Sequence, residues 1–162
     1  MRFIVKREEL LKALLVVGRA INSKTSAVPV LANIKFELND QGLYMTGSNY
    51  DLTIQTKIPY FRNDVELIRN YEHGATLINA KIVTDMARKI DNEELSLEVI
   101  DETIALISGG KIKYNLNCIK ADEYPDVDLL ADGTQIKFTK AEFSSLVSQT
   151  AFAASLKEQI IS

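Results

Sequence analysis

The feature that most constrains this chain is a series of short runs in which apolar and polar side chains alternate. Such alternation indicates β-strands with one buried and one wetted face. The turns between the runs, such as Asp40-Gln41-Gly42 and Gly109-Gly110, are too short for the crossover that parallel strands require. The sequence therefore predicts antiparallel strands, at residues 2–6, 34–38, 43–45, 52–58, 75–78, 95–99, 104–106 and 112–116.

Two segments instead carry apolar residues at steps of three and four, which is the spacing of an amphipathic helix. The first begins at Glu8 and is expected to end near Asn22-Ser23, and the second occupies residues 82–90. The polar stretch from Phe61 to His73 shows neither spacing and is interpreted as a loop. The order of elements predicts an α+β fold, in which an antiparallel sheet carries two helices packed on one face.

Composition narrows the class of protein. The chain has 162 residues, of which 46% are hydrophobic and 25% charged, and this balance is typical of a globular protein. No apolar run reaches the roughly 18 residues that a membrane span requires. The single cysteine, Cys118, cannot form an internal disulfide, and the N-terminus lacks the pattern of a secretion signal. These features predict a cytoplasmic protein that does not enter a membrane.

The end of the chain echoes its beginning. A shift of 133 positions places Lys140 on Arg7 and Phe143 on Leu10, so that residues of the first helix recur. We interpret residues 1–125 as a first domain, 126–133 as an acidic linker and 134–162 as the truncated start of a second domain. Because this last piece is shorter than the roughly 40 residues that a core of its own needs, the chain is expected to be a fragment. The alternative is a C-terminal helix that docks on the first domain.

A search for catalytic or metal-binding residues finds no constellation. His73 is the only histidine and lies in a predicted turn, so that a set of Cys and His ligands cannot form. Gly109-Gly110-Lys111 resembles the end of a phosphate-binding loop, but the upstream glycine is missing and the flanking segments are strands. The sequence therefore predicts a protein that is not an enzyme and that holds no cofactor and no metal.

Charge is distributed unevenly along the chain. The net charge is −3, and residues 91–102 hold six acids and no base. In contrast, Lys12 and Arg19 are seven residues apart on the first predicted helix, and Lys81 and Arg88 have the same spacing on the second. Each pair therefore shares one helix face. Such a stripe is either an ordinary solvated surface or one side of a polarised protein that attracts an anion.

Several short motifs follow one another in a fixed order. They are Met1-Arg2-Phe3 with Arg7 and Leu10-Leu11; Pro29-Val30-Leu31-Ala32-Asn33-Ile34; Leu43-Tyr44-Met45-Thr46-Gly47-Ser48 with Asp51-Leu52; Gly74 with Ala80-Lys81; Glu123-Tyr124-Pro125; and Phe143 with Gln149-Thr150-Ala151-Phe152-Ala153. In this order and spacing the chain resembles the bacterial DNA sliding clamps, the beta subunits of DNA polymerase III. The resemblance covers essentially the whole chain.

The resemblance implies a non-catalytic processivity factor for DNA replication. Clamps of this family have three similar domains per subunit, and two subunits close into a homodimeric ring with sheets outside and helices around the hole. The partners implied for the full-length protein are double-stranded DNA, bound without sequence preference, DNA polymerase III and the clamp loader. The third domain and most of the pocket that binds polymerase peptides fall outside this chain.

The resemblance also implies roles for single residues. Lys24 or Thr25, in the loop after the first helix, would contact DNA, as would Lys81 and, in the second domain, Lys157. The helix cations Lys12, Arg19 and Arg88 would face the phosphates. Lys111 and Lys113 would meet acidic residues of the partner subunit across the subunit interface.

A different class of function fits the same charge pattern. An α+β protein-interaction scaffold could use the basic helix faces to bind an acidic protein instead of DNA. Association with DNA that depends on salt but not on base sequence would distinguish the clamp from the scaffold.

Overall fold

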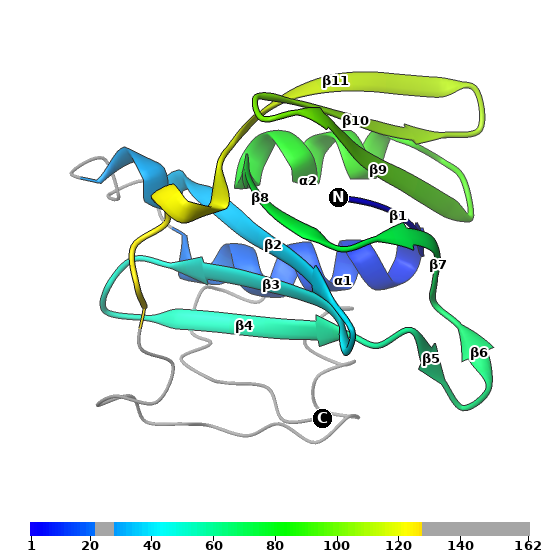
Figure 1. Cartoon of the computed structure of the whole chain (residues 1–162), viewed down its shortest axis with the longest axis horizontal. Coiled ribbons are helices and arrows are strands. Elements are labelled where there is room, and N and C mark those ends of the chain that lie inside the picture. The colour runs from blue at the N-terminus through cyan, green and yellow to red at the C-terminus, as the bar shows by residue number, and fades with distance from the viewer. Residues whose placement is uncertain (22–27, 128–162) are drawn as a thin grey trace.

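The alternating runs form a nine-stranded sheet in which every pairing is antiparallel. The structure, a computed structural model, describes residues 1–21 and 28–127 (Figure 1). The helices are α1 (Arg7–Val17) and α2 (Ala80–Lys89), with 3-10 turns η1 (Gly18–Ala20), η3 (Pro29–Ala32) and η4 (Ala121–Glu123). The strands are β1 (Arg2–Lys6), β2 (Asn33–Asn39), β3 (Gly42–Ser48), β4 (Thr53–Ile58), β5 (Phe61–Arg62), β6 (Val65–Glu66), β7 (Ile68–Glu72), β8 (Gly74–Asn79), β9 (Glu94–Asp101), β10 (Ile104–Gly109) and β11 (Ile112–Ile119).

The sheet is built from two similar units, each with the order strand, helix and three strands. The first unit holds β1, α1 and β2 to β4, and the second holds β8, α2 and β9 to β11. The strand order is β4-β3-β2-β8-β11-β10-β9-β1-β7. The first strand of each unit therefore pairs with the second strand of the other, because β1 lies beside β9 and β8 lies beside β2. This exchange joins the two units into a single sheet.

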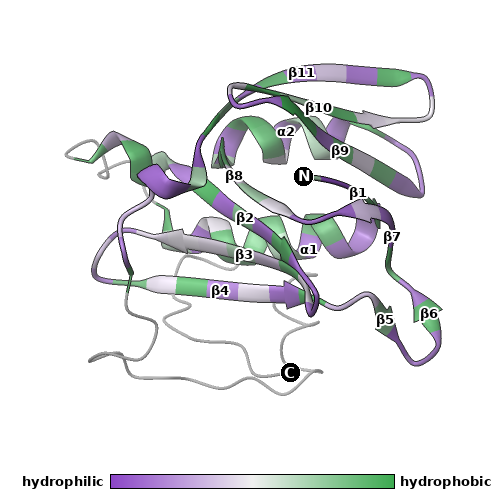
Figure 2. Cartoon of the chain, viewed as in Figure 1, coloured by the Kyte–Doolittle hydropathy of each residue, from purple (hydrophilic) through white to green (hydrophobic). Residues whose placement is uncertain are grey.

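Both helices bury their apolar faces against this sheet. Leu10, Leu14 and Val17 of α1 and Val83 and Ala87 of α2 are almost completely buried in one core shared with the strands. Figure 2 shows apolar and polar residues alternating along the strands, as a half-buried sheet requires. The predicted α+β fold with two helices on one face is thus confirmed.

The first helix ends earlier than predicted. α1 stops at Val17, and the chain continues as the 3-10 turn η1, whereas the apolar spacing predicted a helix to Asn22-Ser23. The backbone N–H of Gly18 still donates to the carbonyl of Leu14, four residues earlier, whereas the N–H of Ile21 donates to the carbonyl of Gly18, three residues earlier, at 3.0 Å. This change to the spacing of a 3-10 turn marks the end of the α-helix. Apolar spacing alone does not locate such an end, because Ala20 of η1 is also buried against the same core.

The prediction of a loop between Phe61 and His73 is wrong, because this segment forms three short strands. β5 and β6 form a hairpin, and β7 then pairs with β1 at the edge of the sheet. The hairpin turn consists of Asn63 and Asp64, which both have positive φ, at 50° and 66°. Two such residues make the type I′ turn that suits the twist of a two-residue hairpin. Two-residue strands are too short to show a period in the sequence.

Gly47 of β3 allows the end of α1 to approach the sheet closely. A Cβ at this residue would lie 2.7 Å from the backbone oxygen of Val17 and 2.8 Å from its Cγ1. We expect Gly47→Ala to lower the free energy of unfolding by about 1–3 kcal/mol, because backbone must move to relieve the overlap. Urea denaturation measures this change.

Gly18→Ala is the matched control for that substitution. A Cβ at residue 18 meets nothing within 4 Å, and its φ is −60°. We expect this variant to be neutral or stabilised by up to about 1 kcal/mol, since alanine restricts the unfolded chain. Equal stability of the two variants would contradict the close contact between Gly47 and α1.

Candidate nucleic-acid interface

The two helices lie side by side and run in opposite directions (Figure 1). Arg7, the first residue of α1, connects them. Its Nε donates to the carbonyl of Ala87 at 3.2 Å, and its Nη2 donates to the carbonyl of Arg88 at 3.1 Å. These carbonyls belong to the last turn of α2, where a cation is favoured by the helix dipole. Arg7 therefore holds the beginning of α1 against the end of α2.

The outward face of α2 is basic. Lys81, Arg88 and Lys89 are exposed, and Asp85 is the only acid within Ala80–Lys89. The helix begins at an asparagine cap, where the side chain of Asn79 accepts from the backbone N–H of Ile82 at 3.0 Å. Arg88 and Lys89 fall in the last turn, where they suit the helix dipole. The predicted pair, Lys81 and Arg88, thus lies on an exposed helix surface.

The predicted cations of the first helix are less prominent. Lys12 lies on α1 but its Nζ is 3.3 Å from the Oε1 of Glu8, one turn earlier, and its side chain is 32% exposed. Arg19 is half-buried and lies in η1, beyond the end of the α-helix. The seven-residue spacing of these two residues therefore does not place them on one continuous α-helical face.

Acidic side chains gather on the strands and their turns. The exposed acids on strands and turns include Glu37, Asp40, Glu98, Asp101 and Glu102. Glu8 and Glu9 of α1 and Asp85 of α2 are exceptions, and the Oε1 of Glu9 is held by Nη1 of Arg62 at 2.6 Å. Within the described residues, α2 is consequently the element with the highest density of exposed positive charge.

Lys111 and Lys113 lie on a different part of the molecule, at one end of β11. Residues 112–117 of this strand pair with β10 on one side. On the other side, β11 pairs with β8 only through Cys118 and Ile119. Within residues 1–21 and 28–127, the first six residues of β11 therefore present an open edge. Lys111, in the preceding turn, and Lys113 are both exposed beside it.

Three predicted site residues cannot be placed. Lys24, Thr25 and Lys157 lie outside the described residues, as do most of the predicted linker and the predicted second domain.

Arg7 is the residue that sequence reasoning missed as a structural element of this interface. A cation in the first turn of a helix opposes the helix dipole, and this unfavourable position is a signal that it bonds elsewhere.

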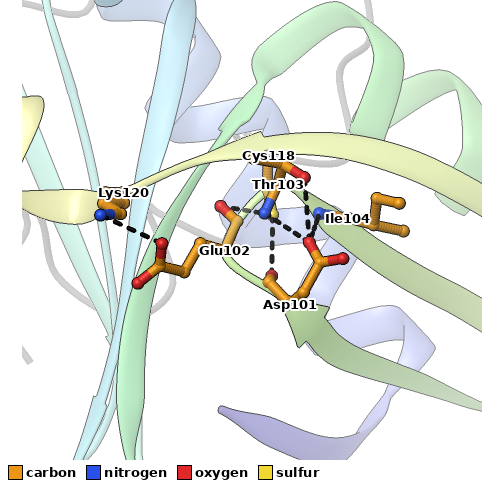
Figure 3. Close-up of polar contacts among 6 residues, drawn as sticks. All are labelled: Asp101, Glu102, Thr103, Ile104, Cys118 and Lys120. Atoms are coloured by element: carbon orange, nitrogen blue, oxygen red, sulfur yellow. Dashed lines mark hydrogen bonds and ion pairs between the residues drawn. The ribbon is translucent and has the colours of Figure 1, made fainter.

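One hollow, of about 370 Å³, lies between the ends of β8, β9 and β11 and the turn η4. Figure 3 shows the polar contacts of Asp101, Glu102 and Lys120, which line it, and these contacts stabilise local structure. Asp101 Oδ1 accepts from the N–H and Oγ1 of Thr103 and from the N–H of Ile104, at 2.7–3.0 Å. These bonds lower the pKa of Asp101. Lys120 Nζ lies 3.0 Å from Glu102, an ion pair that raises the pKa of Lys120.

The cysteine beside this hollow is a poor nucleophile. Cys118 is 4% exposed, and its Sγ donates weakly to the carbonyl of Glu102 at 3.7 Å. Burial raises the pKa of its thiol, so that the thiolate is disfavoured.

Among the described residues, no three His, Cys, Asp or Glu side chains are grouped to hold a metal ion. No helix in this part of the chain has the length and apolar character to cross a membrane.

The geometry above can be compared with known proteins. Residues 1–128 match the family described as DNA polymerase III beta subunit, N-terminal domain. The chain is 29% identical to the beta sliding clamp of Bacillus subtilis over 158 residues, which are 98% of this chain and 42% of that protein. It is 28% identical to the beta sliding clamp of Halalkalibacterium halodurans, again over 98% of this chain and 41% of the relative. The chain thus spans about two-fifths of the length of these relatives.

Solved structures show the same fold. The DNA polymerase sliding clamp from Bacillus subtilis superposes with a TM-score of 0.77 at 29% identity, over 84% of this chain and 36% of the other. The DNA polymerase III beta chain from Streptococcus pneumoniae gives a TM-score of 0.75 at 23% identity, over 83% and 35%. With most of its length matched by the family and its sheet and helices arranged as in these structures, the chain belongs to the DNA polymerase III beta subunit family, and residues 1–128 correspond to the N-terminal domain of that family.

Proposed function

We propose that this chain forms the N-terminal part of a DNA sliding clamp, a non-catalytic ring that encircles double-stranded DNA and tethers the replicative polymerase. The observation that carries the proposal is the family match over residues 1–128, on a domain whose exposed helix face is basic. The alternative, a protein-interaction scaffold, would account for the basic helix face but not for the match to the family.

A topological mode of retention explains how a protein of net charge −3 can work on DNA. A closed ring does not need strong contacts to remain on the duplex. Weak, sequence-independent contacts between helix cations and phosphates are sufficient, and they permit sliding. In this proposal, Lys81 and Arg88 of α2 face the phosphates, with Lys12 and Arg19 as further contributors.

The remaining roles complete the proposal. Lys24 or Thr25, and Lys157, supply DNA contacts from loops. Lys111 and Lys113 join the homodimer interface, since an exposed basic edge is suited to an acidic partner surface. DNA polymerase III and the clamp loader are the proposed protein partners of the full-length clamp, and the cytoplasm is its proposed location.

The decisive experiment uses a full-length clamp that contains this sequence, loaded on nicked circular DNA. We expect the protein to remain on the circle at moderate salt and to leave once the DNA is linearised, because a ring slides off a free end. Gel filtration of the labelled complex measures the retained protein. Equal retention on circular and linear DNA would contradict encirclement, and binding to an acidic protein without any effect of DNA would favour the scaffold.

The contribution of α2 can be measured separately. We expect Lys81→Gln with Arg88→Gln to reduce the slope of log affinity against log salt by about 0.9 for each phosphate contact removed. Fluorescence anisotropy of the full-length clamp with primed DNA, at several salt concentrations, gives this slope. Both residues are exposed, so the thermal midpoint should not change.

Lys57→Gln is the matched control for these α2 variants. Lys57 is an exposed base on β4, where the neighbours that face the core are Ile54 and Ile58. Its alternation with these residues places it on the sheet face opposite the helices. A loss of slope equal to that of the α2 double variant would contradict a helix-lined DNA path.

The proposed subunit interface gives another prediction. We expect Lys111→Glu with Lys113→Glu to shift the full-length clamp from dimer to monomer at concentrations where the wild type is dimeric, because like charges then meet across the interface. Analytical ultracentrifugation without DNA measures the change. The α2 double variant serves as control and should remain dimeric, and an unchanged dimer in the Lys111/Lys113 variant would exclude these residues from the interface.

A further inference from the structure

The hairpin and edge strand that the sequence did not predict expose large apolar side chains. Phe61 on β5, Val65 on β6 and Tyr71 on β7 are 58%, 52% and 47% exposed. They are three of the seven large hydrophobic side chains exposed among the described residues, and they lie within 11 positions of one another. Figure 1 shows the β5–β6 hairpin projecting from the body of the protein next to β7. Val65 pairs with Arg62 and therefore points to the hairpin face opposite Phe61. Phe61 and Tyr71 remain as the exposed rings that mark a candidate interaction surface.

Three of the rings in this region form an ordered row. The ring centroids of Tyr60 and Tyr71 are 4.3 Å apart, and those of Tyr71 and His73 are 5.9 Å apart with an interplanar angle of 7°. The row is anchored by Tyr60, whose hydroxyl donates to the carbonyl of Asn39. The backbone oxygen of Tyr60 also accepts from the N–H of Leu67 at 2.7 Å. The exposed ring of Tyr71 is therefore held in place before any partner arrives.

The hairpin places an aromatic ring beside a carboxylate. Phe61 pairs with Glu66, and Arg62 pairs with Val65, so these two pairs point to opposite faces of the hairpin. Arg62 contacts Glu9 of α1, so the hairpin face that carries Arg62 is turned toward the body of the protein. Phe61 and Glu66 consequently point away from α1, as cross-strand neighbours within contact distance of one another.

The two arginines near this surface are paired with acids, so the charges that remain unpaired on it are negative. Arg62 is engaged by Glu9 at 2.6 Å, and Arg69 of β7 is engaged by Glu94 at 2.8 Å. The hydrogen bond with Glu94 is the main cause of the raised pKa of Arg69, and the charge of Glu66 adds to it. Within the described ranges, Asp64 and Glu66 make no ion pair within 4 Å. Both carboxylates remain available to a partner.

We propose that this surface binds a cationic segment of a partner protein. The aromatic patch, defined as Phe61 with the carboxylates of Asp64 and Glu66 on the hairpin together with the row of Tyr60, Tyr71 and His73, would hold one cationic side chain over Phe61 beside Glu66 and a second over the ring of Tyr71. Ring faces and carboxylates both attract cations, and the attraction grows when water is displaced. The same carboxylates repel phosphate, which disfavours nucleic acid and anionic lipid at this place.

This surface differs from the proposed DNA path. Its charge is opposite to that of α2, and its side chains belong to β5, β6, β7 and the residues beside these strands, which take no part in the helix face. The inference therefore does not depend on encirclement of DNA. A clamp that fails to retain DNA could still bind a cationic segment here, and the reverse is equally possible.

The test is a titration of the full chain with an N-acetylated, amidated octapeptide of alternating arginine and alanine. We expect saturable shifts of the ring proton resonances of Phe61, Tyr71 and His73, and no binding of the peptide with glutamate in place of arginine. Tyr71→Ala should weaken binding by about fivefold to tenfold, and Glu66→Gln by about threefold. Glu66→Gln removes a charge from an exposed side chain, so it tests the proposal without threatening the fold.

Tyr50→Asn is the matched control. Tyr50 is 59% exposed, lies outside the patch and has a φ of 75°, which asparagine tolerates. This variant should bind the peptide as the wild type does. The proposal is overturned if Tyr71→Ala and Glu66→Gln bind the peptide with wild-type affinity, if the shifts map to another surface, or if an oligothymidylate of eight nucleotides produces the same shifts in place of the peptide.

Discussion

The pairing of β1 with β9 and of β8 with β2 is the constraint on which the rest of the structure depends. Each helix follows the first strand of its unit, so exchange of these strands brings both helices to the same face of one sheet. The helices then share a core, and Arg7 of α1 can satisfy the last carbonyls of α2. Without the exchange, each unit would have to bury its apolar face alone.

This arrangement also decides where charge lies. A helix packed on a sheet by one face must turn its other face to solvent, and in α2 that face carries Lys81, Arg88 and Lys89. The acids lie mainly on strands and turns, for example at Glu98, Asp101 and Glu102 of the β9–β10 hairpin. A chain with a small negative net charge can therefore present a basic surface to one partner. The aromatic patch has the opposite sign and is suited to a different partner.

Sequence reasoning succeeded where elements are long and periodic. The alternating strands, the two helices and the exposed cations of α2 were predictable, because period and polarity are properties of consecutive residues. The β5–β6 hairpin and the end of α1 at Val17 were not. Two-residue strands have no period, and the buried residues after Val17 continue the apolar pattern although the backbone leaves the α-helix.

What the sequence determined by itself was the α+β class, the antiparallel pairing imposed by short turns, and the family to which its motifs point. What only the tertiary structure decided was which distant groups meet. Arg7 reaches the end of α2 from 80 positions away, and Tyr60 stacks on Tyr71. The physical reason is that a local pattern specifies which face of an element is buried, whereas the partner of a side chain depends on the packing of elements that are remote in the chain.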